Sequence, residues 1–168
     1  MSMRETRADL DELQALLDRS HAGAGAHLRS IFNDEHRLSA EQVADALDGI
    51  FEMHLATLTG DGAPLVAPVD GIFFKGKVWF GLPTESVRAR LVPRDPRVSA
   101  SYTRGSFAFI VHGRAHEAGF VEEYDALVRE LYVAQYGPGW IKWLEYRLRE
   151  AGPGYTGWIE PRVMFAKR

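Results

Sequence analysis

The 168-residue sequence contains no cysteine, and this absence excludes several kinds of site. Disulfide frameworks, thiolate zinc sites and cysteine nucleophiles all need a residue that the chain does not have. No segment approaches the roughly 20 consecutive apolar residues that a membrane-spanning helix requires. The first residues, 1–14, are polar and acidic, unlike a secretory signal peptide. We therefore expect a cytoplasmic protein with no membrane partner.

An excess of positive charge is also missing. The sequence has 20 Lys and Arg against 23 Asp and Glu, which gives a formal net charge of -3 at pH 7. A nucleic-acid-binding domain usually has a basic face and a high isoelectric point, so no nucleic-acid partner is predicted. The length fits one domain over residues 1–168. The hydrophobic fraction of 46% is enough to form a buried core.

Residues 1–49 have the periodicity of helices and predict a helical N-terminal extension. Leu10, Leu13 and Leu17 recur at helical spacing with acidic residues between them. Ser39 and Gln42 have the spacing of a capping box, in which each residue's side chain bonds the other's backbone N–H. They begin a further helix, whose apolar stripe is predicted to extend to Ile50.

From about residue 53 the pattern changes to short strands joined by turns. Gly60-Asp61-Gly62 is a strong hairpin signal after the first strand. The strands are predicted at 53–59, 64–74, 78–82, 98–103, 107–117 and 155–166. A helical region separates the last two. The predicted fold is mainly β with helices: a six-stranded antiparallel barrel over residues 50–168, with a helical insertion before the last strand.

Several short motifs occur in a characteristic order along these strands. They are Leu55-Ala56-Thr57-Leu58, Asp61-Gly62-Ala63-Pro64, Pro68-Val69, Ser86-Val87-Arg88, Asp95-Pro96-Arg97-Val98 and Val111-His112-Gly113-Arg114-Ala115. Over residues 50–118 and 155–166 this order resembles the pyridoxamine 5′-phosphate oxidase-like family. The resemblance implies a split β-barrel that forms a homodimer, with FMN bound in clefts between the subunits.

The resemblance also implies which residues bind the cofactor. Ser86 would begin a turn with free backbone amides, and Arg88 would contact the phosphate through its planar fork of donors. Arg90 joins this set if the chain is extended there, but it points elsewhere on a helix. Two strand segments would contact the flavin ring. The implied cofactor-binding residues are Ala67, Pro68, Val69, Asp70, Gly81, Leu82, Ser86, Arg88 and Arg90.

The sequence departs from true pyridoxamine phosphate oxidases at positions that matter for their substrate. Gly71 stands where they have a basic residue, and Ala108 stands near their flavin-contacting glutamine. The predicted function is therefore an FMN-dependent oxidoreductase that transfers hydride with an unidentified small organic substrate. A deazaflavin coenzyme, or a non-catalytic flavin- or haem-binding module, remains an alternative. No catalytic residue is identified.

Two further features of the sequence are a pair of histidines and a pair of tryptophans. His112 and His116 are four residues apart, but on a strand this spacing separates them by about 13 Å, too far to share a zinc ion. No metal site is predicted. Trp140 and Trp143 lie at helical spacing, where they either belong to a core or interface, or cover the cofactor.

Overall fold

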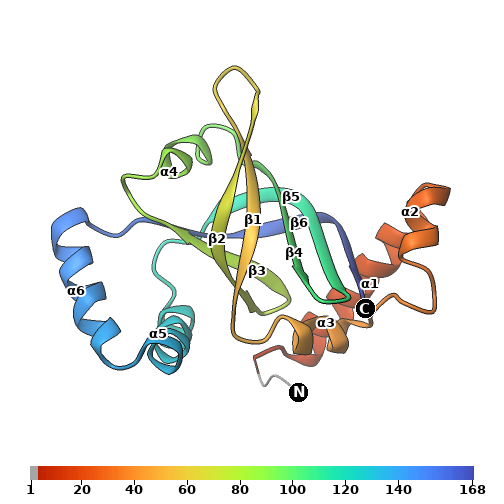
Figure 1. Cartoon of the computed structure of the whole chain (residues 1–168), viewed down its shortest axis with the longest axis horizontal. Coiled ribbons are helices and arrows are strands. Elements are labelled where there is room, and N and C mark those ends of the chain that lie inside the picture. The colour runs from red at the N-terminus through yellow and green to blue at the C-terminus, as the bar shows by residue number, and fades with distance from the viewer. Residues whose placement is uncertain (1–3) are drawn as a thin grey trace.

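Six antiparallel strands close into a barrel in the order β1-β2-β3-β6-β5-β4 (Figure 1). The computed structural model describes residues 4–168. The strands are β1 (Ile50–Leu58), β2 (Pro64–Phe74), β3 (Lys77–Leu82), β4 (Arg97–Arg104), β5 (Phe107–Glu117) and β6 (Tyr155–Lys167). The predicted six-stranded antiparallel barrel is confirmed.

The barrel interior is formed by alternate residues of each strand, because successive side chains point to opposite faces. On β1, Phe51, Met53 and Leu55 are buried, whereas Glu52 and His54 are exposed on the outer face. The largest side chains with almost no exposure are Phe80 on β3 and Phe109 on β5. The outer face of the sheet is therefore left for helices and for ligands.

Three helices precede the barrel: α1 (Arg7–Ala22), α2 (Ala26–Ile31) and α3 (Ala40–Ala46). They lie near the C-terminus on one side of the barrel (Figure 1). Leu13, Leu16 and Leu17 of α1 belong to the main core. The buried Ser20 hydroxyl accepts a hydrogen bond from the Met164 amide of β6 at 3.0 Å. The N-terminal helices therefore brace β6.

The prediction that the third helix extends to Ile50 is wrong. Helix α3 ends at Ala46, and Gly49 has a φ of 88°, a left-handed conformation that glycine adopts without strain. Ile50 instead begins β1, where it pairs with Ile72 of β2. An isoleucine suits both patterns, and the long-range pairing with β2 decides between them.

The other helices lie on the opposite side of the barrel, apart from the short α4 (Val87–Leu91) between β3 and β4 (Figure 1). Helices α5 (Glu122–Tyr136) and α6 (Gly139–Ala151) form the predicted insertion before the last strand. Tyr124 of α5 stacks on Trp79 of β3, with ring centroids 4.5 Å apart. Helix α5 therefore covers part of the outer sheet. No helix in residues 4–168 is long and apolar enough to cross a bilayer.

Candidate functional site

The ladder between β2 and β3 is incomplete, and this gap defines the candidate site. The two strands pair only from Gly71–Phe80 to Phe74–Lys77. Within the described chain, β2 from Pro64 to Asp70 therefore pairs with β1 alone. A strand without a second partner leaves backbone N–H and C=O groups free to bond a side chain or a ligand. We call this segment of β2, residues 64–70, the open edge.

The Arg88 guanidinium from α4 lies against the open edge. It donates one hydrogen bond to the Ala67 carbonyl and one to the Pro68 carbonyl, each at 3.1 Å. The side chain is half-buried, and this burial lowers the pKa of the guanidinium. No carboxylate among residues 4–168 forms an ion pair with it. Because a guanidinium carries five N–H groups, three remain for another acceptor. The structure thus brings together Arg88, Ala67 and Pro68, which the sequence predicted as neighbours of one cofactor.

The other predicted cofactor residues on α4 and β3 differ in exposure and in the contacts that they make. Ser86 is the N-cap residue of α4, but its hydroxyl makes no capping hydrogen bond. Arg90 is exposed, and the helical backbone turns it away from the face of Arg88. On β3, Gly81 is exposed, whereas the Leu82 side chain is only 2% exposed within the barrel. A ligand on the outer face can therefore reach Leu82 only through its backbone.

Asp70, at the end of the open edge, has a partner that the sequence did not reveal. The Tyr132 hydroxyl of α5 donates a hydrogen bond to the Asp70 carboxylate at 2.5 Å. Burial raises the pKa of Tyr132, and the bond to Asp70 raises it further, so the phenol stays protonated. The residues are 62 positions apart, and only the packing of α5 on the sheet brings them together. This pair places a proton donor and a carboxylate beside the open edge.

A cluster of aromatic rings joins Tyr132 of α5 to two tryptophans of α6. The ring of Trp140 stacks on Tyr132 with centroids 4.5 Å apart and an interplanar angle of 21°. Trp143 lies next to Trp140, at 6.3 Å, and is 55% exposed. Trp140 is therefore packed between the two helices, whereas Trp143 remains on the surface. The open edge itself shows apolar surface, because Val66 is 61% exposed.

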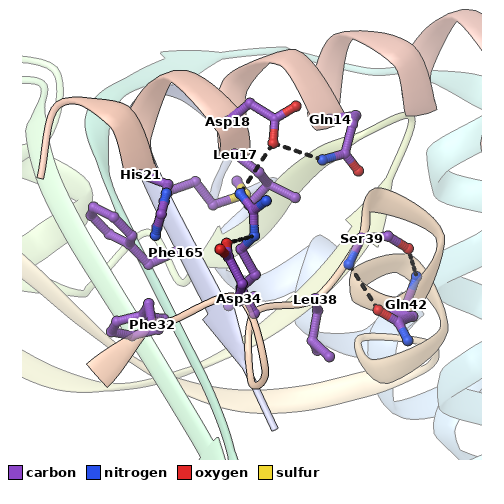
Figure 2. Close-up of a pocket in the computed structure, with 13 residues that line it drawn as sticks. Gln14, Leu17, Asp18, His21, Phe32, Asp34, Leu38, Ser39, Gln42 and Phe165 are labelled. Carbon is purple, nitrogen blue, oxygen red and sulfur yellow. Dashed lines mark hydrogen bonds and ion pairs between the residues drawn. The ribbon is translucent and has the colours of Figure 1, made fainter. Parts of the chain in front are cut away.

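A separate small cavity lies between the N-terminal helices and β6 (Figure 2). Its volume of about 260 Å³ is below the usual range for drug-sized ligands, which begins at about 300 Å³. Its polar groups already pair with one another: Arg37 bonds Asp18 and Asp34, and Ser39 bonds Gln42. This cavity is a seam between packed elements and is not the candidate site.

The two histidines that were weighed as metal ligands have separate partners. His112 Nδ1 lies 2.7 Å from the Ser99 hydroxyl, and His116 Nε2 lies 2.7 Å from a Glu160 carboxylate oxygen. Within residues 4–168, no group of three or more His, Asp or Glu side chains is arranged to hold a metal ion.

Comparison with known proteins identifies the fold. No protein-family model matches the chain, and neither does a curated protein. One similar solved structure is that of a conserved hypothetical protein from Mycobacterium tuberculosis. The match covers 80% of this chain and 88% of that protein's chain, with 19% identity and a TM-score of 0.66. An FAD-binding protein from Mesorhizobium loti matches 77% and 93%, with 17% identity and a TM-score of 0.54. An F420 reductase matches 71% and 93%, with 20% identity and a TM-score of 0.52.

These matches and the barrel topology show that the chain has the pyridoxamine 5′-phosphate oxidase-like split-barrel fold. The fold implied by the sequence motifs is confirmed. The same fold occurs in a haem storage protein from Vibrio cholerae, with 12% identity and a TM-score of 0.56. The fold alone therefore does not identify the cofactor, which must be inferred from the residues of the site.

Proposed function

We propose that the chain is an FMN-dependent oxidoreductase that transfers hydride with a small organic substrate. The observation that carries this proposal is the half-buried Arg88 guanidinium at the open edge, which has no acidic partner in the described chain. Partial burial of an unpaired charge is unfavourable, so an anionic ligand is the partner expected there. The remaining donors of Arg88 suit a phosphate, which accepts charge-assisted hydrogen bonds from a planar fork.

The open edge provides the surface for the flavin ring in this proposal. The exposed side chains of Val66 and Pro68 offer apolar surface, and the backbone of Val69 and Asp70 offers hydrogen bonds, while the Ala67 and Pro68 carbonyls hold Arg88 in place. Bound FMN supplies the two-electron redox chemistry, while the protein orients the ring and excludes water. Gly81, Ser86 and Arg90 complete the proposed binding residues, and Leu82 takes part through its backbone.

The Asp70–Tyr132 pair has a positioning role in this proposal and transfers no proton in the reaction. Tyr132 holds its proton toward the Asp70 carboxylate, and burial keeps the phenol neutral. In the proposal, Asp70 orients the edge of the ring or the substrate, and Tyr132 fixes the position of that carboxylate.

We also propose that the protein acts as a homodimer, with the cofactor bound between the two subunits. Apolar side chains that are unusually exposed in the single chain support this, since such patches often mark protein contacts. They include Val66 on the open edge and, on α6, Trp143 and Leu148. Light scattering tests the dimer directly: a mass of twice 18.8 kDa supports it, and a mass of 18.8 kDa contradicts it.

The cofactor proposal is tested by titration with FMN and, in parallel, with coenzyme F420. Two of the structural neighbours are described as an FAD-binding protein and an F420 reductase, which supports a flavin-type ligand. Saturable binding of FMN supports the proposal as stated. Binding of F420 alone keeps the site but replaces the cofactor, and binding of neither rejects the oxidoreductase.

A haem-binding module is the second candidate function. The haem storage protein with the same fold favours it, and so does His54, which is exposed directly across the ladder from Pro68. An imidazole there would bind the haem iron if a haem lay against this part of the sheet. A haem titration with the His54→Ala variant as control separates the candidates. Haem binding that needs His54, without flavin binding, favours the module.

A further inference from the structure

A second cleft, larger than the seam in Figure 2, lies on the outer face of the barrel. Its volume of about 740 Å³ falls within the range of small-molecule sites. It is formed where β1, β4, β5 and β6 lie side by side, together with Pro64 at the start of the open edge, and neither Ser86 nor Arg88 lines it. We call it the arginine cleft. Its charged and polar lining residues are Thr57, Arg97, Ser99, His112, Arg114, Glu160 and Arg162.

A β-bulge places one of these arginines. On β5 and β6, His112 pairs with Val163 and Gly113 with Pro161, so Arg162 is an extra residue without a ladder partner. A Cβ atom on Gly113 would lie 2.0 Å from the Glu160 carbonyl oxygen, so only glycine permits this close approach. Bulges redirect a side chain and often occur beside functional sites. Here the bulge turns Arg162 into the cleft lining.

The cleft lining has three arginines and one carboxylate, so the protein neutralises its positive charge only in part. Arg97 and Arg114 are directly opposite one another across β4 and β5, an arrangement that is unfavourable for like charges. Arg97 pairs with Asp95 at 2.5 Å. Within residues 4–168, the side chains of Arg114 and Arg162 form no hydrogen bond or ion pair, and the Asp95 carboxylate attracts Arg114 without pairing with it. Two guanidinium groups therefore remain available for an anion.

His112 also lines the cleft, and its hydrogen bond to Ser99 determines which ring nitrogen can donate to a ligand. Its Nδ1 atom lies 2.7 Å from the Ser99 hydroxyl, and when that hydroxyl donates, the imidazole hydrogen is on Nε2. The Glu160 carboxylate is the only acidic group in the lining, and it lies 2.7 Å from His116 Nε2. The lining also includes the apolar residues Ala56, Leu58 and Val98.

We propose that the arginine cleft is a second ligand site, which binds the oxyanion of a small carboxylate or phosphate compound through Arg114 and Arg162. An oxyanion relieves the repulsion among the arginines and accepts charge-assisted hydrogen bonds from their planar forks. The apolar lining residues accommodate a short hydrocarbon body beside that group. This site is independent of the cofactor proposed at Arg88.

Calorimetric titration of the full-length chain with sodium succinate and with sodium phosphate, at matched ionic strength, tests this site. Saturable binding of either anion is expected, and the tighter of the two identifies the ligand as carboxylate or phosphate. The double variant Arg114→Gln/Arg162→Gln should bind at least about tenfold more weakly, because two charge-assisted contacts are lost. The control Lys142→Gln/Arg149→Gln removes the same charge from the exposed face of α6 and should bind as the wild type does.

Three results would overturn the proposal. The first is that the wild type binds neither anion. The second is that the double variant binds as tightly as the wild type, and the third is that the control loses binding to the same extent as the double variant. An FMN titration of the double variant separates this site from the proposed cofactor site. Unchanged FMN binding is expected, and loss of FMN binding assigns the cleft to the cofactor instead. Circular dichroism of both double variants verifies that the fold is retained, since all four substituted side chains are exposed.

Discussion

Replacement of Arg88 by glutamine separates the two roles that this residue can have, in binding and in folding. In the folded chain Arg88 donates two hydrogen bonds, to the Ala67 and Pro68 carbonyls. Their loss costs about 0.5–1.5 kcal/mol each. Removal of a half-buried unpaired charge offsets most of this cost. We expect the free energy of unfolding to change by less than about 1 kcal/mol.

The expected effect on FMN binding is larger. A charge-assisted bond to phosphate contributes about 2–3 kcal/mol, so the dissociation constant should rise by about 30- to 150-fold. Quenching of flavin fluorescence measures the constant, and urea denaturation measures stability. Arg94→Gln, an exposed arginine just after α4, is the matched control and should leave both unchanged. A variant of Arg88 that loses stability but keeps its FMN affinity would refute the reasoning.

Three further predictions test the barrel. Gly113→Ala should destabilise the fold by about 2–3 kcal/mol, since its Cβ would meet the β6 backbone, whereas Gly60→Ala has open space and should stay within about 0.5 kcal/mol, both by urea denaturation. Phe80→Ala should cost about 3–5 kcal/mol because the ring is fully buried, whereas Phe120→Ala, 80% exposed, should be nearly neutral in the same assay. In an alkaline absorbance titration, three of the six tyrosines should ionise only above the usual pKa of 10. Burial raises the pKa values of Tyr124, Tyr132 and Tyr155, that of Tyr155 to about 12. Since these phenols bind their protons more tightly when folded, stability should fall as pH rises above 10; normal ionisation of all six would contradict the packing.

The sequence predicted the barrel well because some of its strands, β1 above all, alternate between buried and more exposed residues. On β1 and β5 this alternation alone defines the inner face, and Gly60-Asp61-Gly62 fixes the first hairpin. The end of α3 was misplaced because Ile50 fits either a helix or a strand. A contact with Ile72, 22 positions later in the chain, resolves it. Local patterns do not contain such a contact.

The candidate site was predicted only where it depends on short motifs. The motif around Arg88 identified the residue, but the two carbonyls that it contacts follow from the ladder gap between β2 and β3. The bond between Tyr132 and Asp70 joins segments 62 positions apart, and the bulge at Arg162 depends on the register of β5 and β6. These features arise from strand register and helix packing, which periodicity does not specify.

The most direct test of the central proposal is a titration of the purified chain with FMN, followed by quenching of flavin fluorescence. If the half-buried arginine at the open edge holds a phosphate-bearing redox cofactor, quenching should saturate at one flavin per chain. Quenching that never saturates, together with no binding of F420 by the same chain, would contradict the account.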